Sequence, residues 1–256
     1  MAIIIKTPKE IEILREGGKR LATVLYKVRD IVKPGISTWE LDEYAEKLIK
    51  DTGDYPAFLN YKPEGADFAY PASLCISVNN EVVHGIPKKE KILQEGDIVS
   101  LDLGLRHHGL FTDMAITVPV GEVSNSSLKL MKITEEALQT GIDAARGGNR
   151  IGDIGSAIEN FVRRHKYGIV EVLSGHGVGK EIHEDPYIPN FGKANTGAKL
   201  VPGMVIAIEP MLNNGTKNVI LDKDGYTFRT ADSKRSAHFE HTILITEGEP
   251  EILTKI

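Results

Sequence analysis

The stretch Leu101–Met114, LDLGLRHHGLFTDM, joins two apolar runs through a polar centre, and each run carries one aspartate. The two ends predict strands, and the centre, RHHG, predicts the turn between them. A turn centred between the two histidines places Asp102 and Asp113 directly opposite each other on one face of the hairpin. A loop of two or four residues gives that pairing, whereas a three-residue loop would put the acids on opposite faces.

Two facing carboxylates need an explanation in this apolar setting. Like charges paired across a hairpin are destabilising, and the neighbours Leu101, Leu103 and Ala115 indicate burial. Buried carboxylates that face each other need a cation or a shared proton. A bound cation is therefore the first hypothesis, and other segments should supply further ligands.

The composition limits the class of protein. The 256 residues suffice for one large domain or two small ones, with a hydrophobic content of 41% that is ordinary for globular proteins. The net charge of −5 argues against nucleic acid as a main partner. The single cysteine, Cys75, excludes an internal disulfide framework and a cysteine-rich zinc site. The opening MAIIIKTPKE soon turns charged, so we expect no signal peptide, no membrane span and a cytoplasmic location.

Helical and strand patterns follow the same order in each half. Helical patterns within 7–33 and 37–53, and a loop at 54–67, precede strand-like runs at 73–78, 81–84, 97–105 and 110–120. In the second half, helical patterns at 127–146 and 151–166 precede strand-like runs at 169–173, 204–210, 218–222, 226–230 and 238–246. This order predicts an internal duplication, with two α+β halves of about 1–120 and 121–256 around one composite sheet in a single domain, 1–256.

Two glutamates are candidates for further ligands. Glu209 is the only charged residue in the run Met204–Met211, MVIAIEPM, and a lone glutamate there is more often functional or metal-bound than structural, because burial of an unpaired carboxylate is costly. Glu240, in SAHFEHTILIT, shares a strand face with His238 and Thr242. For Glu240, a solvated position at the polar end of a strand is an equally good interpretation.

Three of the eight histidines stand at strand ends or among glycines. His176 lies in SGHGVG, where three glycines permit a tight, unusual backbone; His183 follows seven residues later, and His84 closes the run EVVHGIP. One such histidine alone is more often an ordinary polar residue, but their joint placement favours function. The others receive no functional assignment: His107, His108, His165, His238 and His241.

The donor types indicate the kind of metal. Oxygen-rich ligation with one imidazole suits divalent ions such as Mn(II), Fe(II) or Co(II). Four carboxylates can neutralise two such ions, so we expect a dinuclear centre. Ions of this kind lower the pKa of water and allow hydrolysis without a serine or cysteine nucleophile.

These motifs, in this order, resemble the type I methionine aminopeptidases. The matching segments are VVHGIP with His84, SLDLG with Asp102, FTDMA with Asp113, SGHGVG with His176, IHEDP with His183, IAIEPM with Glu209 and FEHT with Glu240. The opening IKTPKEIEILREGGK resembles the first helix of that family, so the resemblance spans essentially the whole chain. It implies the α+β pita-bread fold, with two pseudo-symmetric halves around a central antiparallel sheet. It also implies a hydrolase that removes the initiator methionine when the second residue is small.

The resemblance further implies roles for individual residues. The dinuclear site would comprise Asp102, Asp113, His176, Glu209 and Glu240, and hold Co(II), Mn(II) or Fe(II), with Zn(II) as a further candidate. Asp113 and Glu240 would bridge the ions, and Glu209 would also act as general base. His183 would polarise the scissile carbonyl, and His84 would contact the substrate amide and assist proton transfer.

The methionine pocket is implied to include Tyr70, Cys75 and Tyr226. This chain departs from the family pattern in having Ile182 where an aromatic is usual, Tyr226 where tryptophan is common, and a longer loop at 62–67. The partners implied are nascent N-termini and, transiently, the ribosome, for a monomer without membrane or specific nucleic-acid binding.

Three alternatives fit parts of the pattern. A proline-specific peptidase of the same fold, such as aminopeptidase P or prolidase, usually carries a large additional N-terminal domain. A metal-free pita-bread protein that binds peptides would be expected to lack the ligands. An acidic globular protein with a buried structural metal would leave His84 and His183 unexplained.

Overall fold

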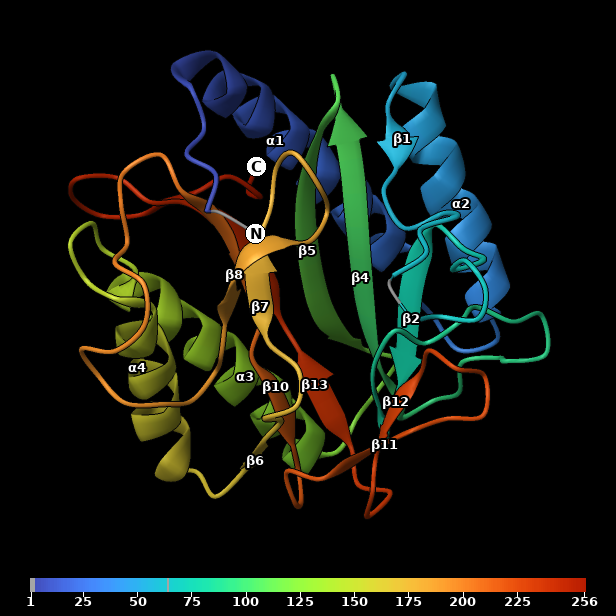
Figure 1. Cartoon of the computed structure of the whole chain (residues 1–256). Helices are drawn as coiled ribbons and strands as arrows, with labels where there is room; N and C mark the ends of the chain where they lie inside the picture. Colours follow the sequence, from blue (N-terminus) through green and yellow to red (C-terminus); the bar gives the residue numbers. More distant parts are fainter. Residues whose placement is uncertain (1–2, 64) are drawn as a thin grey trace.

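An antiparallel sheet of nine strands lies at the centre of the structure, a computed structural model that describes residues 3–63 and 65–256 (Figure 1). Its main path is β1-β4-β5-β14-β9-β7-β8, with β2 also paired to β4 and β15 to β14. The strands are β1 (Tyr55–Pro56), β2 (Leu74–Val78), β4 (Ile98–His107), β5 (Leu110–Pro119), β7 (Gly175–Gly177), β8 (Glu184–Ile188), β9 (Val205–Ile208), β14 (Glu240–Leu244) and β15 (Glu251–Ile252).

The remaining strands of the described residues form two small antiparallel sheets beside the central one. One has the order β13-β10-β6 and the other β11-β12-β3. Their strands are β3 (Glu81–Val83), β6 (Gly168–Ile169), β10 (Met211–Asn213), β11 (Val219–Leu221), β12 (Phe228–Thr230) and β13 (Ser236–His238).

The first two helices begin where their capping residues predict, and the third begins at Asn125, two residues before its predicted start. They are α1 (Pro8–Asp30), α2 (Thr38–Asp51), α3 (Asn125–Ala144) and α4 (Ile151–Arg163). At the start of α1, Thr7 Oγ1 accepts the amide of Glu10 while the Glu10 carboxylate accepts the amide of Thr7, and Ser37 and Glu40 make the same reciprocal pair at α2. No helix in the described part of the chain is both long enough and apolar enough to cross a membrane.

The helices bury their apolar faces against the sheet. Helix α1 packs on β4 and β5, α2 on β2, α3 on β9 and β14, and α4 on β8 (Figure 1). One continuous core joins Leu21 and Leu25 of α1 to Leu101 of β4, Ile158 of α4 and Ile206 of β9. Each such aliphatic side chain contributes about 1.5–3 kcal/mol when fully buried. The central strands therefore have a fixed framework.

The hairpin of β4 and β5 has a different centre from the one that the sequence predicts. His107 pairs with Leu110, which leaves His108 and Gly109 as a two-residue turn with φ of 46° and 85°. Positive φ at both positions is the pattern of a type I′ turn, and glycine adopts it without strain. The prediction that Asp102 and Asp113 are directly opposite is therefore wrong: Asp102 pairs with Ala115, and Asp113 with Gly104. The two acids share a face but are diagonal neighbours.

Two predicted strands are shorter than expected. The run 204–210 is reduced to β9, and a separate strand, β10, follows it; the run 238–246 is reduced to β14, and His238 instead ends β13. In both places the chain passes between the central sheet, which holds β9 and β14, and the β13-β10-β6 sheet. Pro210 has no amide to donate to a ladder, which explains the end of β9. Glu209 therefore stands where the chain passes from one sheet to the next.

Smaller differences affect the loops. The predicted loop 54–67 includes the short strand β1, and its residue 64 lies outside the described residues. The predicted strand 169–173 is reduced to β6. The next two strands, β7 and β8, were not predicted, because no apolar run marks them in the sequence.

Candidate active site

Five consecutive strands of the central sheet each bring one predicted metal ligand to a common cavity. In sheet order these are Asp102 on β4, Asp113 on β5, Glu240 on β14, Glu209 directly after β9, and His176 on β7. All five line a cavity of about 140 Å³, as do His84, His183, Tyr70, Cys75 and Tyr226. The sheet topology thus gathers ligands from widely separated parts of the chain.

The ligand atoms form three overlapping trios among the described residues. In each trio the atoms lie within 4.8 Å of one another, and the trios are Asp102–Asp113–Glu240, His176–Glu209–Glu240 and Asp113–His176–His183. His176 Nε2 lies 3.6 Å from Glu209 Oε1, 3.9 Å from Asp113 Oδ2 and 4.0 Å from Glu240 Oε1. Asp113, His176 and Glu240 each belong to two trios.

His176 is held on a strand, not on the unusual backbone that its glycine neighbours predict. A side chain at Gly177 would place Cβ 2.3 Å from the carbonyl oxygen of Asp185, so glycine lets β7 pass close to β8. The Nδ1 of His176 donates to the carbonyl of Gly177 at 2.9 Å. In the neutral ring, Nε2 then keeps its lone pair, and it faces the carboxylates as a ligand nitrogen must.

The carboxylates are buried without enough partners. Asp102 Oδ1 and Glu240 Oε1 find no hydrogen-bond partner among the described residues. Burial raises the pKa of all four carboxyl groups, to about 8 for Asp113 and about 7 for Glu209, and for Asp102 and Glu240 the neighbouring carboxylate of Asp113 is the next cause. Because uncompensated buried charge is unfavourable, and the donors are oxygen-rich with one nitrogen, the cluster fits divalent cations.

His183 stands at the cavity wall in the loop between β7 and β8. Its Nδ1 lies 3.0 Å from the hydroxyl of Tyr61, and its ring centroid is 4.5 Å from that of His176. Burial in the cleft lowers the pKa of His183 well below its usual value, so the ring is neutral near pH 7. A neutral ring here could donate one N–H to a substrate or offer a lone pair to a metal.

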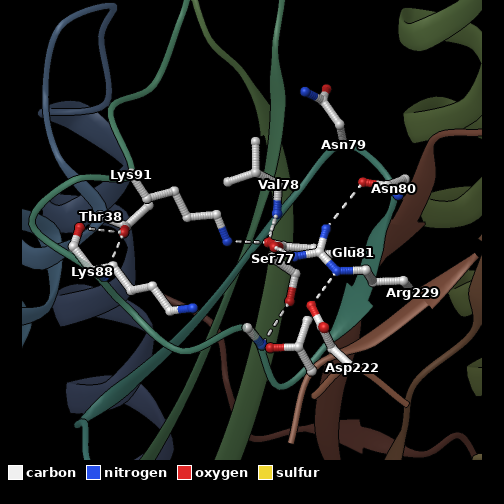
Figure 2. Close-up of polar contacts among 12 residues, drawn as sticks. Thr38, Ser77, Val78, Asn79, Asn80, Glu81, Lys88, Lys91, Asp222 and Arg229 are labelled. Carbon is white, nitrogen blue, oxygen red and sulfur yellow. Dashed lines mark hydrogen bonds and ion pairs between the residues drawn. The ribbon is translucent and has the colours of Figure 1, made fainter. Parts of the chain in front are cut away.

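His84 directly follows β3 and has φ of 58°, a conformation that few non-glycine residues adopt. Figure 2 shows the polar network that fixes this strand: the buried Glu81 accepts from the Val78 amide and from Arg229 Nη2, both at 2.8 Å, and from Lys91. Arg229 lies on β12 and also binds Asp222, at the other side of the β11–β12 turn that contains Tyr226. The network thus joins β3, which His84 directly follows, to both ends of the turn that contains Tyr226.

The predicted pocket residues form an apolar cluster beside the carboxylates. Tyr70 and Tyr226 meet edge to face with ring centroids 5.2 Å apart, and the Tyr70 hydroxyl donates to the carbonyl of Gly85 at 2.9 Å. Ile182 and Cys75 belong to the same buried cluster, which also contains Phe58. Pro63, from the loop 62–67, lies at the rim of the cavity.

Two residues without a sequence assignment stand at the site. His238, which had no functional assignment from its sequence context, is buried with Nε2 3.4 Å from Glu209 Oε2, and neither ring nitrogen has a hydrogen-bond partner in the described residues. Its two-residue spacing from Glu240 was the available signal, because residues two apart share a face within one strand. The expectation of one shared strand is wrong, since His238 ends β13 and Glu240 begins β14. Tyr61, by contrast, lies in a loop with no periodic pattern.

Comparisons with known proteins identify the family of this chain. Residues 12–247 match metallopeptidase family M24. The methionine aminopeptidase of Aquifex aeolicus is 46% identical over 260 residues, covering all of both chains, and methionine aminopeptidase 1 of Bacillus subtilis is 45% identical, covering 99% of this chain and all of the relative.

Solved structures give the same result. The crystal structure of methionine aminopeptidase from Thermotoga maritima matches with a TM-score of 0.94 at 44% identity, over all of both chains. Prolidase from Pyrococcus furiosus matches with a TM-score of 0.77 at 26% identity, covering 99% of this chain but 66% of that chain. The fold is therefore the predicted pita-bread fold, and the chain belongs to the methionine aminopeptidases of metallopeptidase family M24.

Proposed function

We propose that this protein removes the initiator methionine from nascent proteins whose second residue is small, by metal-dependent hydrolysis. The observation that carries the proposal is the convergence of Asp102, Asp113, His176, Glu209 and Glu240 on a cavity walled by an apolar pocket. Full-length similarity to methionine aminopeptidases supports the choice of methionine as the residue released.

The five residues would hold two divalent ions, with Mn(II), Fe(II), Co(II) or Zn(II) as candidates. Their four carboxylates balance the charge of two such ions. Asp113 and Glu240 are assigned as bridging ligands. This is supported by the fact that, of the four carboxylates, these are the two that belong to two ligand trios each, and a carboxylate has two oxygens to share between ions. Ions bound there would supply the Lewis acidity that lowers the pKa of water and polarises a peptide carbonyl.

The chain's own residues supply the proton transfers. Glu209, whose Oε1 lies 3.6 Å from His176 Nε2 within the ligand cluster, is assigned to accept the proton of the attacking water. His183 is assigned to donate an N–H to the scissile carbonyl oxygen as negative charge develops there. His84 is assigned to contact the substrate amide and assist protonation of the leaving amine.

The methionine side chain would enter the cluster of Tyr70, Cys75 and Tyr226, next to Ile182. Aromatic edges and sulfur give the polarizable contacts that a thioether prefers. The main substrates would be nascent N-termini, so we propose that the protein is cytoplasmic and contacts the ribosome transiently. We further propose that it is a monomer. We also propose one domain, 1–256, in which β5 and β14 join halves of about 1–120 and 121–256.

Release of methionine from Met-Ala-Ser tests the proposal directly. Chelator-treated protein should lose the activity and recover it when Mn(II), Fe(II) or Co(II) is added. An X-Pro peptide measured in parallel tests the proline-specific alternative. Cleavage of X-Pro in preference to Met-Ala-Ser, or methionine release that persists without metal, would contradict the proposal.

A further inference from the structure

A lysine from the N-terminal segment reaches the loop that presents His183. Lys6 precedes α1, and its amide donates to the carbonyl of Gly203 at 2.8 Å, just before β9. Its Nζ lies 2.5 Å from Glu184 Oε2, and both side chains are almost fully buried, with exposed fractions of 1% and 4%. Glu184 directly follows His183 in the chain.

The Glu184 carboxylate also accepts hydrogen bonds from the backbone of the loop 178–183, which joins β7 to β8. Its Oε1 accepts the amide of Glu181 at 3.0 Å and the amide of Lys180. The carboxylate therefore spans two partners: Lys6 on one oxygen and the loop backbone on the other. Any displacement of Lys6 changes the position of the group that shapes the loop 178–183.

The loop and the N-terminal segment also fit each other closely. Gly179 has φ of 140°, and a Cβ there would lie 2.4 Å from Lys6 Cε, so only glycine leaves room for the lysine stem. One residue of the same loop, Lys180, forms an ion pair with Glu10 in the first turn of α1. The N-terminal side thus contributes Lys6 and Glu10, and the loop contributes the opposite charges, Glu184 and Lys180. We call these two pairs the N-terminal clasp.

The two pairs differ in importance. The Glu10–Lys180 pair is at the surface, where such pairs contribute little. The Lys6–Glu184 pair is buried, and loss of one partner leaves an uncompensated charge. The loop that the clasp holds carries Ile182, at the pocket, and His183, at the cavity wall.

We infer that Lys6 is a positioning residue for this reaction: through Glu184 it holds the loop 178–183 so that His183 and Ile182 face the substrate. This inference rests on the proposed function. Lys6 touches neither the substrate cavity nor the metal ligands, so its effect is on placement. A misplacement of about 1 Å far from the chemistry can cost about 100-fold in rate.

Three variants separate positioning from simple stability. Lys6→Met keeps the apolar stem and removes the charge. Glu184→Gln keeps an oxygen for the loop amides. Lys6→Met/Glu184→Gln removes both buried charges together. Lys47→Met, at the exposed Lys47–Asp51 pair of α2, is the matched control.

Lys6→Met should lower kcat/KM for Met-Ala-Ser at least about tenfold while the affinity for Mn(II), measured by calorimetry, changes less than about twofold. In metal-free protein, the amides of Lys180 and Glu181 should exchange with solvent faster. The double variant should regain thermal stability, because no unpaired charge remains buried, yet keep the reduced kcat/KM. Lys47→Met should match the parent protein in every measurement.

Recovery of both stability and kcat/KM in the double variant would overturn the inference, because the pair would then matter only as buried charge. Unchanged activity and unchanged exchange in Lys6→Met would also overturn it. If the parent protein itself releases no methionine, the proposed function fails instead, and the exchange measurement still reports whether Lys6 orders the loop.

Discussion

The imidazole of His238 and the carboxylate of Glu209 face each other across 3.4 Å; the histidine is buried, and the glutamate side chain is 13% exposed. Burial lowers the pKa of His238 to about 3, so the ring is neutral and carries one N–H. Neither of its nitrogens has a hydrogen-bond partner in the described residues, which leaves Glu209 as the acceptor within reach. His238 is thus placed to orient a carboxylate that we assign both to the metals and to catalysis.

His238→Phe should weaken metal binding by about 10–100-fold, the usual effect of removing a residue that orients a ligand. Calorimetric titration with Mn(II) measures this directly. His241→Phe is the control, because His241 binds Thr254 Oγ1 at 2.9 Å and does not face the cavity. Equal metal affinities in the two variants would show that His238 fills space only.

His183→Ala should separate chemistry from coordination. If His183 donates to the scissile carbonyl, kcat/KM should fall by about 100-fold or more while the metal content stays near that of the parent. Atomic absorption and steady-state kinetics on Met-Ala-Ser measure both quantities. Since His183 also forms a ligand trio with Asp113 and His176, loss of metal together with activity would identify it as a ligand instead.

The metal-free protein should become less stable as the pH rises from about 6.5 to about 8. The carboxyl groups of Glu209 and Asp113 have folded-state pKa values of about 7 and about 8, above unfolded values near 4. The folded state therefore binds more protons in this interval, and the stability from that protonation is lost as the pH rises through the folded pKa values.

The pH interval from about 6.5 to about 8 is chosen because, below it, the buried histidines change the free energy of unfolding with pH in the opposite direction. His84 and His238 have folded pKa values of about 4 and about 3, so their contribution is lost only as the pH falls below about 6.5. Urea unfolding of chelator-treated protein across this pH interval measures how the free energy of unfolding changes with pH. Bound metal should remove this pH dependence, since the ligands are then deprotonated throughout. A free energy of unfolding that rises across the interval would contradict the assignment.

The pocket gives a prediction about binding rather than chemistry. Tyr226→Ala should raise KM for Met-Ala-Ser more than it lowers kcat, because it removes side-chain contacts that are the same in the ground and transition states. Ile182→Phe tests the departure from the family pattern. Methionine binding should tighten or stay unchanged if the space beside Gly104 admits the ring. The side chain of Ile182 is already close to Gly104, since a Cβ added to this glycine would lie 3.1 Å from Ile182 Cδ1.

Steady-state kinetics with Met-Ala-Ser and a norleucine analogue measure the effect. Methionine should remain preferred by a modest margin, since one methylene-scale contact changes discrimination by about 1–3 kcal/mol. An unaltered KM in Tyr226→Ala would remove this residue from the pocket.

Much of the fold could be predicted because its signals are local. Thr7-Pro8 and Ser37-Thr38 mark the helix starts through caps that involve only four residues. Glu209 and Asp113 are recognisable as site candidates because each is a lone charge in an apolar strand. The structure brings these residues into one cavity, while their individual roles stay predictions.

What the sequence did not reveal depends on contacts between distant segments. The turn centre moved by one residue because Gly109 takes the positive φ that closes the hairpin. Strand β7 has no apolar run, and it is a strand only because β8 and β9 lie on either side of it. The partners Lys6 and Glu184 are far apart in the chain, and no periodic pattern marks a buried ion pair.

The arrangement of one predicted ligand on, or directly after, each of five neighbouring strands has a consequence for the lifetime of the protein. Strands β4 to β7 cannot separate without pulling the ligands apart, so bound ions would stabilise the folded state and oppose its loss. Stability would then depend on the free metal concentration, by about 1.4 kcal/mol for each tenfold change above the dissociation constant. Metal starvation of a cell would therefore deplete the polypeptide itself, through proteolysis of opened molecules, and not only its activity.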